Sequence, residues 1–234
     1  MKINDIEAAL HNLAERRPLF WSEADFQFEL AWELHKLLGE SAKIYLERRY
    51  EPNKSESSNT TTLSKILEKY YVDIWIEYND AIYPIELKYT TKECWLEGDN
   101  YADCVHTKDQ AAIDIGAYRF LWDIKRLEDI KECHKGVKHG YAIMLTCDAK
   151  YYKEPKNKRE TIFDNFRLTN GRKIASNTSL SWKIASQLKD HWTEKWPPFN
   201  LKNEYQLSWK RYGKDIKAQC SSGAVELKYL IIEV

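Results

Sequence analysis

The stretch YYVDIWIEYNDAIYPIELKY, residues 70–89, decides the fold of this chain. Two largely apolar runs flank the dipeptide Asn-Asp at 79–80, a pattern that predicts an antiparallel β-hairpin closed by a tight two-residue turn. A tight turn fixes the register of the two strands that it joins. In this register Asp73 lies opposite Glu86.

Asp73 and Glu86 form the centre of the predicted site. Directly opposed residues share a face of the sheet with Cβ atoms about 4.5–5.5 Å apart, and like charges in that position are destabilising. Lys88, two residues along the same face as Glu86, supplies a positive group. Carboxylate oxygens also suit Mg²⁺ or Mn²⁺ better than zinc. We therefore predict a metal site at this position, and the alternative is a surface ion-pair ladder on a half-exposed hairpin.

The tetrapeptide ELKY occurs a second time, in AVELKYLIIEV at 224–234. Its nearest upstream acid, Asp215, lies in a stretch with little strand character, and no tight turn would place this acid opposite Glu226. Beyond Lys228 the same face of the strand becomes apolar. We therefore expect a closing strand that begins with a solvated Glu226 and Lys228, and we assign the site to the first copy.

The stretch WSEADFQFELAWELHKLLG at 21–39 predicts a helix with a serine N-cap and a glycine just past its end. At 100° per residue its apolar side chains gather on one arc. Glu23 and Gln27 fall inside this arc, although buried charge is costly unless it is paired. Glu29 and Glu33 are predicted to point outward.

The remaining pattern predicts a second amphipathic helix at 107–132 and a buried strand at 140–148. The order helix, strand, hairpin, helix, strand predicts an α/β or α+β fold with a central mixed β-sheet flanked by helices. The length predicts a single domain at 1–234. Within it we expect a core at 20–147 and a C-terminal extension at 148–234 that completes the domain.

Composition and charge limit the possible partners. Hydrophobic residues make up 43% of the chain and charged residues 31%, which indicates a folded globular protein. The formal net charge is zero, so any binding to nucleic acid must come from a local patch, and no apolar run is long enough to cross a membrane. The five cysteines contain no C-x-x-C pair and suit neither a disulfide framework nor a zinc ribbon. We therefore expect a cytoplasmic protein without a membrane partner.

Asp73, followed after twelve residues by Glu86 and Lys88 in an ExK pattern, resembles the motif of the PD-(D/E)XK nuclease superfamily. The resemblance covers residues 20–147, and the run SEADFQ…LAW is similar to an uncharacterised bacterial branch of that superfamily. It implies a restriction-endonuclease-like core in which Asp73 and Glu86 hold Mg²⁺ or Mn²⁺. Lys88 would orient the attacking water or help to deprotonate it. Val72 stands where the proline of the nominal signature would be.

The resemblance implies two further site residues. Many members add a metal-binding glutamate from the first helix, and Glu23 is the acid on the predicted sheet-facing arc. Some branches carry Gln-x-x-x-Tyr on the following helix. Here Gln110 is followed four residues later by Asp114, and Tyr118 comes four residues after that, so the match is partial. The alternatives are an ordinary first-turn acid at Glu23 and a polar residue at a helix start at Gln110.

The function that the resemblance implies is hydrolysis of phosphodiester bonds. A bound divalent ion lowers the pKa of its water and polarises the phosphoryl oxygen. We therefore expect a Mg²⁺-dependent nuclease that acts on nucleic acid, on DNA more than on RNA, and a homodimer is compatible with this function. The alternative is a catalytically inactive nucleic-acid-binding or protein-interaction module with the same fold.

Overall fold

The computed structural model describes residues 1–50, 70–96, 105–108, 112–155, 159–183, 192–219 and 224–234. The helices are α1 (Ile3–Arg16), α2 (Glu23–Leu38), α4 (Ile113–Cys133) and α5 (Trp192–Lys195), with a 3-10 turn η3 (Asp164–Phe166). The longer strands are β1 (Lys43–Arg49), β2 (Tyr71–Tyr78), β3 (Ala81–Thr90), β6 (Tyr141–Thr146) and β14 (Lys228–Glu233). The short strands are β4 (Cys94–Leu96), β5 (Val105–Thr107), β7 (Lys173–Ile174), β8 (Thr178–Leu180), β9 (Phe199–Leu201), β10 (Tyr205–Gln206), β11 (Lys210–Arg211), β12 (Ile216–Gln219) and β13 (Ala224–Val225).

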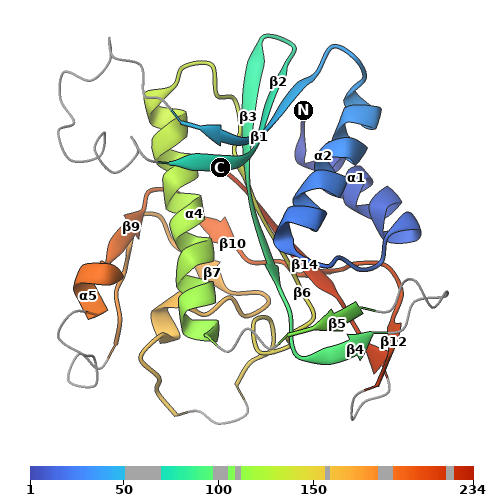
Figure 1. Cartoon of the computed structure of the whole chain (residues 1–234). Helices are drawn as coiled ribbons and strands as arrows, with labels where there is room; N and C mark the ends of the chain where they lie inside the picture. The colour runs from blue at the N-terminus through green and yellow to red at the C-terminus, as the bar shows by residue number, and fades with distance from the viewer. Residues whose placement is uncertain (51–69, 97–104, 109–111, 156–158, 184–191, 220–223) are drawn as a thin grey trace.

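A central sheet contains the strands in the order β1-β2-β3-β6-β14-β11. β3 and β6 pair in parallel, while the other neighbours pair antiparallel. α1 and α2 cover one face of this sheet, and α4 covers the other (Figure 1). The prediction of a mixed central sheet flanked by helices is therefore confirmed, in an α+β arrangement.

Side chains alternate between the two faces of the sheet, and this alternation positions the predicted site. Ile143 of β6 belongs to the core under α1 and α2, whereas Ala142 and Met144 belong to the core under α4. In the parallel ladder Glu86 pairs with Ala142 and Lys88 with Met144. Both charged side chains of the ELK motif therefore face α4.

The predicted hairpin is confirmed together with its register. Asn79 and Asp80 have φ angles of 51° and 56°, as a two-residue turn of the mirror-image type requires. The ladder of β2 and β3 pairs Tyr78 with Ala81 and continues in the predicted register to Ile74 and Ile85. The next pair in that register would be Asp73 with Glu86, one position beyond the end of the ladder.

α2 begins and ends as predicted. The Ser22 hydroxyl accepts a hydrogen bond from the Asp25 N–H at 3.1 Å, and Gly39 ends the helix with a φ of 77°. A glycine tolerates this left-handed conformation without steric cost. The local signals of a serine cap and a terminal glycine are therefore sufficient to place this helix.

The prediction that Glu29 and Glu33 point outward is wrong. Their exposed fractions are 8% and 4%, because α1 packs against this side of α2. Glu29 forms ion pairs with Arg16 at 2.7 Å and with Arg17 at 2.9 Å. The arginines come from the end of α1 and the segment after it, so the pattern of α2 alone contains no signal for this burial.

The second predicted helix begins later than expected. α4 starts at Ile113, and Thr107 belongs to β5, where it pairs with Cys94 and donates a hydrogen bond to the Cys94 carbonyl at 3.1 Å. The predicted strand at 140–148 corresponds to β6, whose residues are all buried. Residues after 148 contribute β14 and β11 to the central sheet.

The charged residues of the second ELKY are only partly exposed, rather than fully solvated as predicted. Lys228 begins β14, is partly buried and places its ammonium 4.9 Å from the centre of the Tyr152 ring. Glu226 is also partly buried and lies 3.7 Å from Lys228. Within the described ranges, no helix is long and apolar enough to cross a membrane.

Candidate active site

The site begins at a gap in the sheet beside Asp73. The β1–β2 ladder pairs residues on both sides of this position, and the β2–β3 ladder stops one residue short of it, at Ile74. Opposite Asp73, Glu47 of β1 has a φ of 50°, a left-handed conformation that is uncommon outside glycine. The Gln27 amide donates to the Asp73 carbonyl at 2.6 Å and to a Glu47 carboxylate oxygen at 2.8 Å. The buried Gln27 side chain of α2 therefore replaces the missing strand-to-strand bond.

The Asp73 side chain bridges β2 and β3. Its Oδ2 accepts a hydrogen bond from the Leu87 N–H at 2.6 Å, where a ladder bond would otherwise form. Burial raises the pKa of Asp73 from 3.8 to about 6, although the Lys88 ammonium and the bond from Leu87 lower it. The structure thus brings Asp73 beside the ELK motif, and its carboxyl takes up a proton at a higher pH than an exposed aspartate does.

Glu86 is the most deeply buried acid of the site, with an exposed fraction of 2%. The Tyr70 hydroxyl donates to its Oε1, and the Arg126 guanidinium of α4 donates to its Oε2 at 2.9 Å. Burial raises the pKa of the Glu86 carboxyl well above its usual value, and the neighbouring Asp73 carboxylate raises it further. Both oxygens of Glu86 are therefore engaged by protein groups.

α4 contributes two side chains that the sequence patterns did not predict. Arg126 donates to Asp123 Oδ1 at 2.6 Å and lies 3.7 Å above the centre of the Tyr70 ring. Asp123 has an exposed fraction of 3%, and its Oδ2 lies 3.0 Å from the Lys88 ammonium. The only local signal was the spacing of Asp123 and Arg126, which puts an acid and a base on one side of the helix.

Lys88 is held in its charged form. Burial alone would lower the pKa of its ammonium, but the surrounding carboxylates, those of Asp123 and Glu23 foremost, outweigh burial and the pKa stands above its usual value. The lysine can donate hydrogen bonds but is a poor proton acceptor at neutral pH.

Glu23 approaches the site from the first turn of α2. Its Oε2 accepts a hydrogen bond from the Tyr89 N–H at 2.8 Å, next to Lys88 in β3. Its charge contributes to the raised pKa of both Asp73 and Lys88, so the three groups are electrostatically coupled. Gln110, the remaining predicted site residue, lies outside the described residues.

The composition of the site fits a hard divalent cation. The acids are Glu23, Asp73, Glu86 and Asp123, and the cations are Lys88 and Arg126. The buried Asp123 Oδ2 is paired with the Lys88 ammonium at 3.0 Å. An all-oxygen donor set with an excess of negative charge suits Mg²⁺ or Mn²⁺. In the part of the chain that the structure describes, however, no three His, Cys, Asp or Glu side chains are already grouped as ligands of one ion.

No protein-family model, no curated protein and no solved structure matches this chain. The geometry of the site therefore has to support any assignment of function. The resemblance to the PD-(D/E)XK superfamily stays a prediction drawn from Asp73, Glu86 and Lys88.

Proposed function

We propose that this chain is a Mg²⁺-dependent phosphodiesterase with a restriction-endonuclease-like core, which cleaves nucleic acid and prefers DNA to RNA. The observation that supports this proposal is the convergence of Asp73, Glu86 and Lys88 with Glu23 at one gap in the sheet. An excess of buried carboxylates without a bound cation destabilises the folded protein. Such clusters occur at functional sites, which makes this one a candidate. The preference for DNA follows from the resemblance to the PD-(D/E)XK superfamily.

Asp73, Glu23 and Glu86 are the residues that would hold the ion. Among the described residues, Asp73 and Glu23 each use one carboxylate oxygen as a hydrogen-bond acceptor, which leaves the other oxygen for a ligand. Glu86 would have to lose the hydrogen bond that Arg126 donates to its Oε2 before that oxygen could bind a metal. When bound, a divalent ion would supply an activated water and polarise the phosphoryl oxygen.

Lys88 would act as a cation rather than as a base. Its raised pKa keeps the ammonium protonated at neutral pH, and the Asp123 carboxylate holds it 3.0 Å away on the α4 side. A fixed ammonium at this position can donate a hydrogen bond to a phosphate oxygen and offset the charge that develops there. Asp123 is a positioning residue in this scheme, because it acts through Lys88.

The hydrogen bonds of Glu86 also favour a second candidate function. Tyr70 and Arg126 saturate both of its oxygens, as would be expected if this acid were a structural residue of an inactive nucleic-acid-binding module. Such a module has no need of a divalent ion at Asp73. Metal binding therefore separates the two functions.

The deciding experiment is a calorimetric titration of Mn²⁺ into the wild type and Asp73→Asn, with plasmid cleavage measured in the same buffers. Glu40→Gln serves as a matched control, because this side chain is 99% exposed and lies outside the site. We expect the wild type and the control to bind Mn²⁺ and cleave, and Asp73→Asn to lose both. A wild type that binds no Mn²⁺ and cleaves nothing would reject the nuclease in favour of the binding module.

A further inference from the structure

A second, smaller sheet follows β3 and contains β13, β12, β4 and β5 (Figure 1). In its antiparallel ladders Trp95 of β4 is the partner of His106 in β5 and of Gln219 in β12. The alternate residues Cys94, Thr107 and Ala218 are buried with exposed fractions of 5–8%. Trp95 and His106 therefore lie on the outward face of this sheet.

Trp95 is an exposed aromatic side chain that its neighbours hold in place. Its exposed fraction is 53%, and its ring stacks on His106 with the ring centres 4.2 Å apart and an angle of 11° between the planes. A carboxylate oxygen of Glu93 lies 3.7 Å from Nε2 of His106, the ring on which Trp95 stacks. This stacking holds the indole ring on the surface of the sheet, so part of its large, flat, apolar area stays in contact with water.

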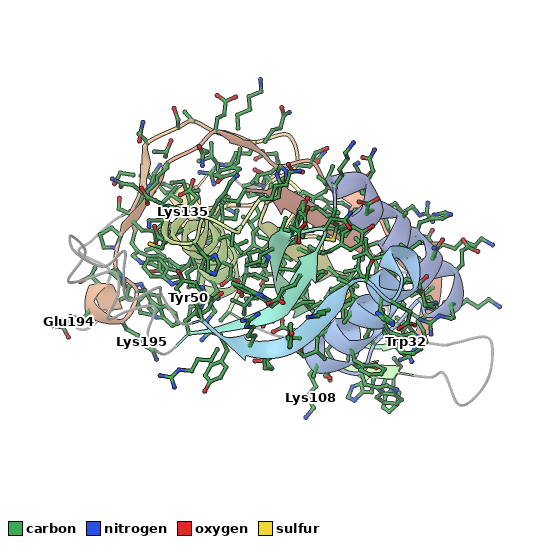
Figure 2. The ribbon with its side chains drawn as sticks, turned by 90° about the horizontal axis from the view of Figure 1, so that it is seen from above. Trp32, Tyr50, Lys108, Lys135, Glu194 and Lys195 are labelled. Carbon is green, nitrogen blue, oxygen red and sulfur yellow. The ribbon has the colours of Figure 1, made fainter. Side chains whose placement is uncertain are left out.

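Among the residues that the structure describes, the charges on the face of Trp95 are two lysines and one glutamate. Lys217 lies two residues before the β12 partner of Trp95 and so shares its face, and Lys108 follows β5 directly; both are exposed. Figure 2 shows Lys108 extending away from the body of the molecule. Glu93, directly before β4, is the described acid beside this pair of rings and lies 3.7 Å from His106 Nε2. The chain as a whole is neutral, so within the described residues Lys108 and Lys217 form a local basic surface beside an aromatic ring.

The patch is close to the candidate active site along the chain. Trp95 follows Lys88 by seven residues, and β3 runs directly from Lys88 toward β4. Seven extended residues span at most about 23 Å, the length of a few nucleotides of a stretched strand. A nucleic acid that occupied the site would therefore need only a few nucleotides to span the distance to Trp95.

We infer that Trp95, with Lys108 and Lys217, forms a stacking platform for single-stranded nucleic acid that enters or leaves the active site. The inference rests on the proposed function, since it names the form of substrate that the site receives. An aromatic ring can stack only on a base whose face is open, and every base of a single strand offers such a face. In a duplex the neighbouring base pairs cover these faces. Flanking lysines supply the contacts to phosphate that such platforms use.

The experiment measures the fluorescence anisotropy of a labelled dT oligonucleotide of twelve residues and of a duplex of equal length, in EDTA so that no cleavage occurs. Base stacking on an aromatic side chain predicts that Trp95→Ala raises the Kd for the single strand by about 5- to 150-fold. Trp95→Phe should retain part of the affinity. Trp32→Ala is the matched control, because Trp32 is 52% exposed but lies on α2, and it should change the Kd by less than twofold. Lys217→Ala should make the slope of log K against log salt less steep by about 0.7, because one contact to phosphate is lost.

Three outcomes would overturn the platform: no binding of the oligonucleotide by the wild type, equal losses in Trp95→Ala and Trp32→Ala, or binding of the duplex as tight as that of the single strand. The plasmid assay tests the nuclease separately. Binding of dT that depends on Trp95 in a protein without cleavage activity would reject the nuclease and retain the platform. Cleavage by the wild type, together with a Kd that Trp95→Ala leaves unchanged, would support the nuclease and reject the platform.

Discussion

Replacement of Asp73 by asparagine should stabilise the metal-free protein while it abolishes metal binding. Asparagine has nearly the same shape, and its amide oxygen can still accept the hydrogen bond that Leu87 donates to Asp73. The substitution removes the charge that burial opposes. Burial raises the pKa of Asp73 from 3.8 to about 6, which means that the folded protein favours the neutral side chain.

The magnitude follows from linkage between proton binding and folding. Between pH 3.8 and about 6 the folded state binds the Asp73 proton more tightly than the unfolded chain does, so the free energy of unfolding of the wild type falls as the pH rises through this window. Above it, the full difference in pKa corresponds to about 3 kcal/mol. Asp73→Asn has no carboxyl group to ionise at this position, so its free energy of unfolding does not fall in this way. For a chain of this size, about 3 kcal/mol corresponds to a rise in Tm of about 6–12 °C.

Thermal and urea unfolding in EDTA would measure this effect at pH 8 and pH 4.5. We expect Asp73→Asn to be more stable by about 3 kcal/mol at pH 8 and by about 1 kcal/mol at pH 4.5. Asp80→Asn is the matched control, because Asp80 is exposed in the hairpin turn and asparagine tolerates its positive φ. Equal or lower stability of Asp73→Asn at pH 8 would show that the buried charge is not destabilising, and would refute the electrostatic reasoning for a cation site.

Three further predictions concern the partners of the carboxylates. Lys88→Met should lower plasmid cleavage by about 100-fold or more without weakening Mn²⁺ binding in calorimetry, and unchanged cleavage would remove Lys88 from the reaction. Arg126→Met should cost about 3–5 kcal/mol in EDTA, because it leaves Glu86 buried without its cation. Mn²⁺ should then raise the Tm of this variant more than that of the wild type, and an equal rise would mean that Glu86 does not bind the metal. Gln27→Ala should lower the free energy of unfolding in urea by about 1–3 kcal/mol, since the Asp73 carbonyl loses its partner; no change would show that water replaces the amide.

Part of the candidate site could be predicted from the sequence because its geometry is local. The register of a two-residue turn determines which residues of a hairpin face each other, so Asp73, Glu86 and Lys88 could be grouped without a structure. Glu23 was included from its place on the apolar arc of a helix, and it does approach Lys88. The groups that set the charge of these residues could not be predicted in this way. Arg126 reaches Glu86 only because α4 packs across β3, a contact between segments 40 residues apart.

Local sequence signals account for the hairpin, the bounds of α2 and the mixed character of the sheet, since turn residues, helix caps and the periodicity of apolar residues act over a few neighbouring positions. Which charges are buried, and which groups lie beside them, depends instead on tertiary packing. Glu29 became buried through the arginines at the end of α1, and Lys88 became a fixed cation through Asp123 of α4. The physical reason is that the pKa and the partner of a charge depend on everything packed around it, and these neighbours come from distant parts of the chain.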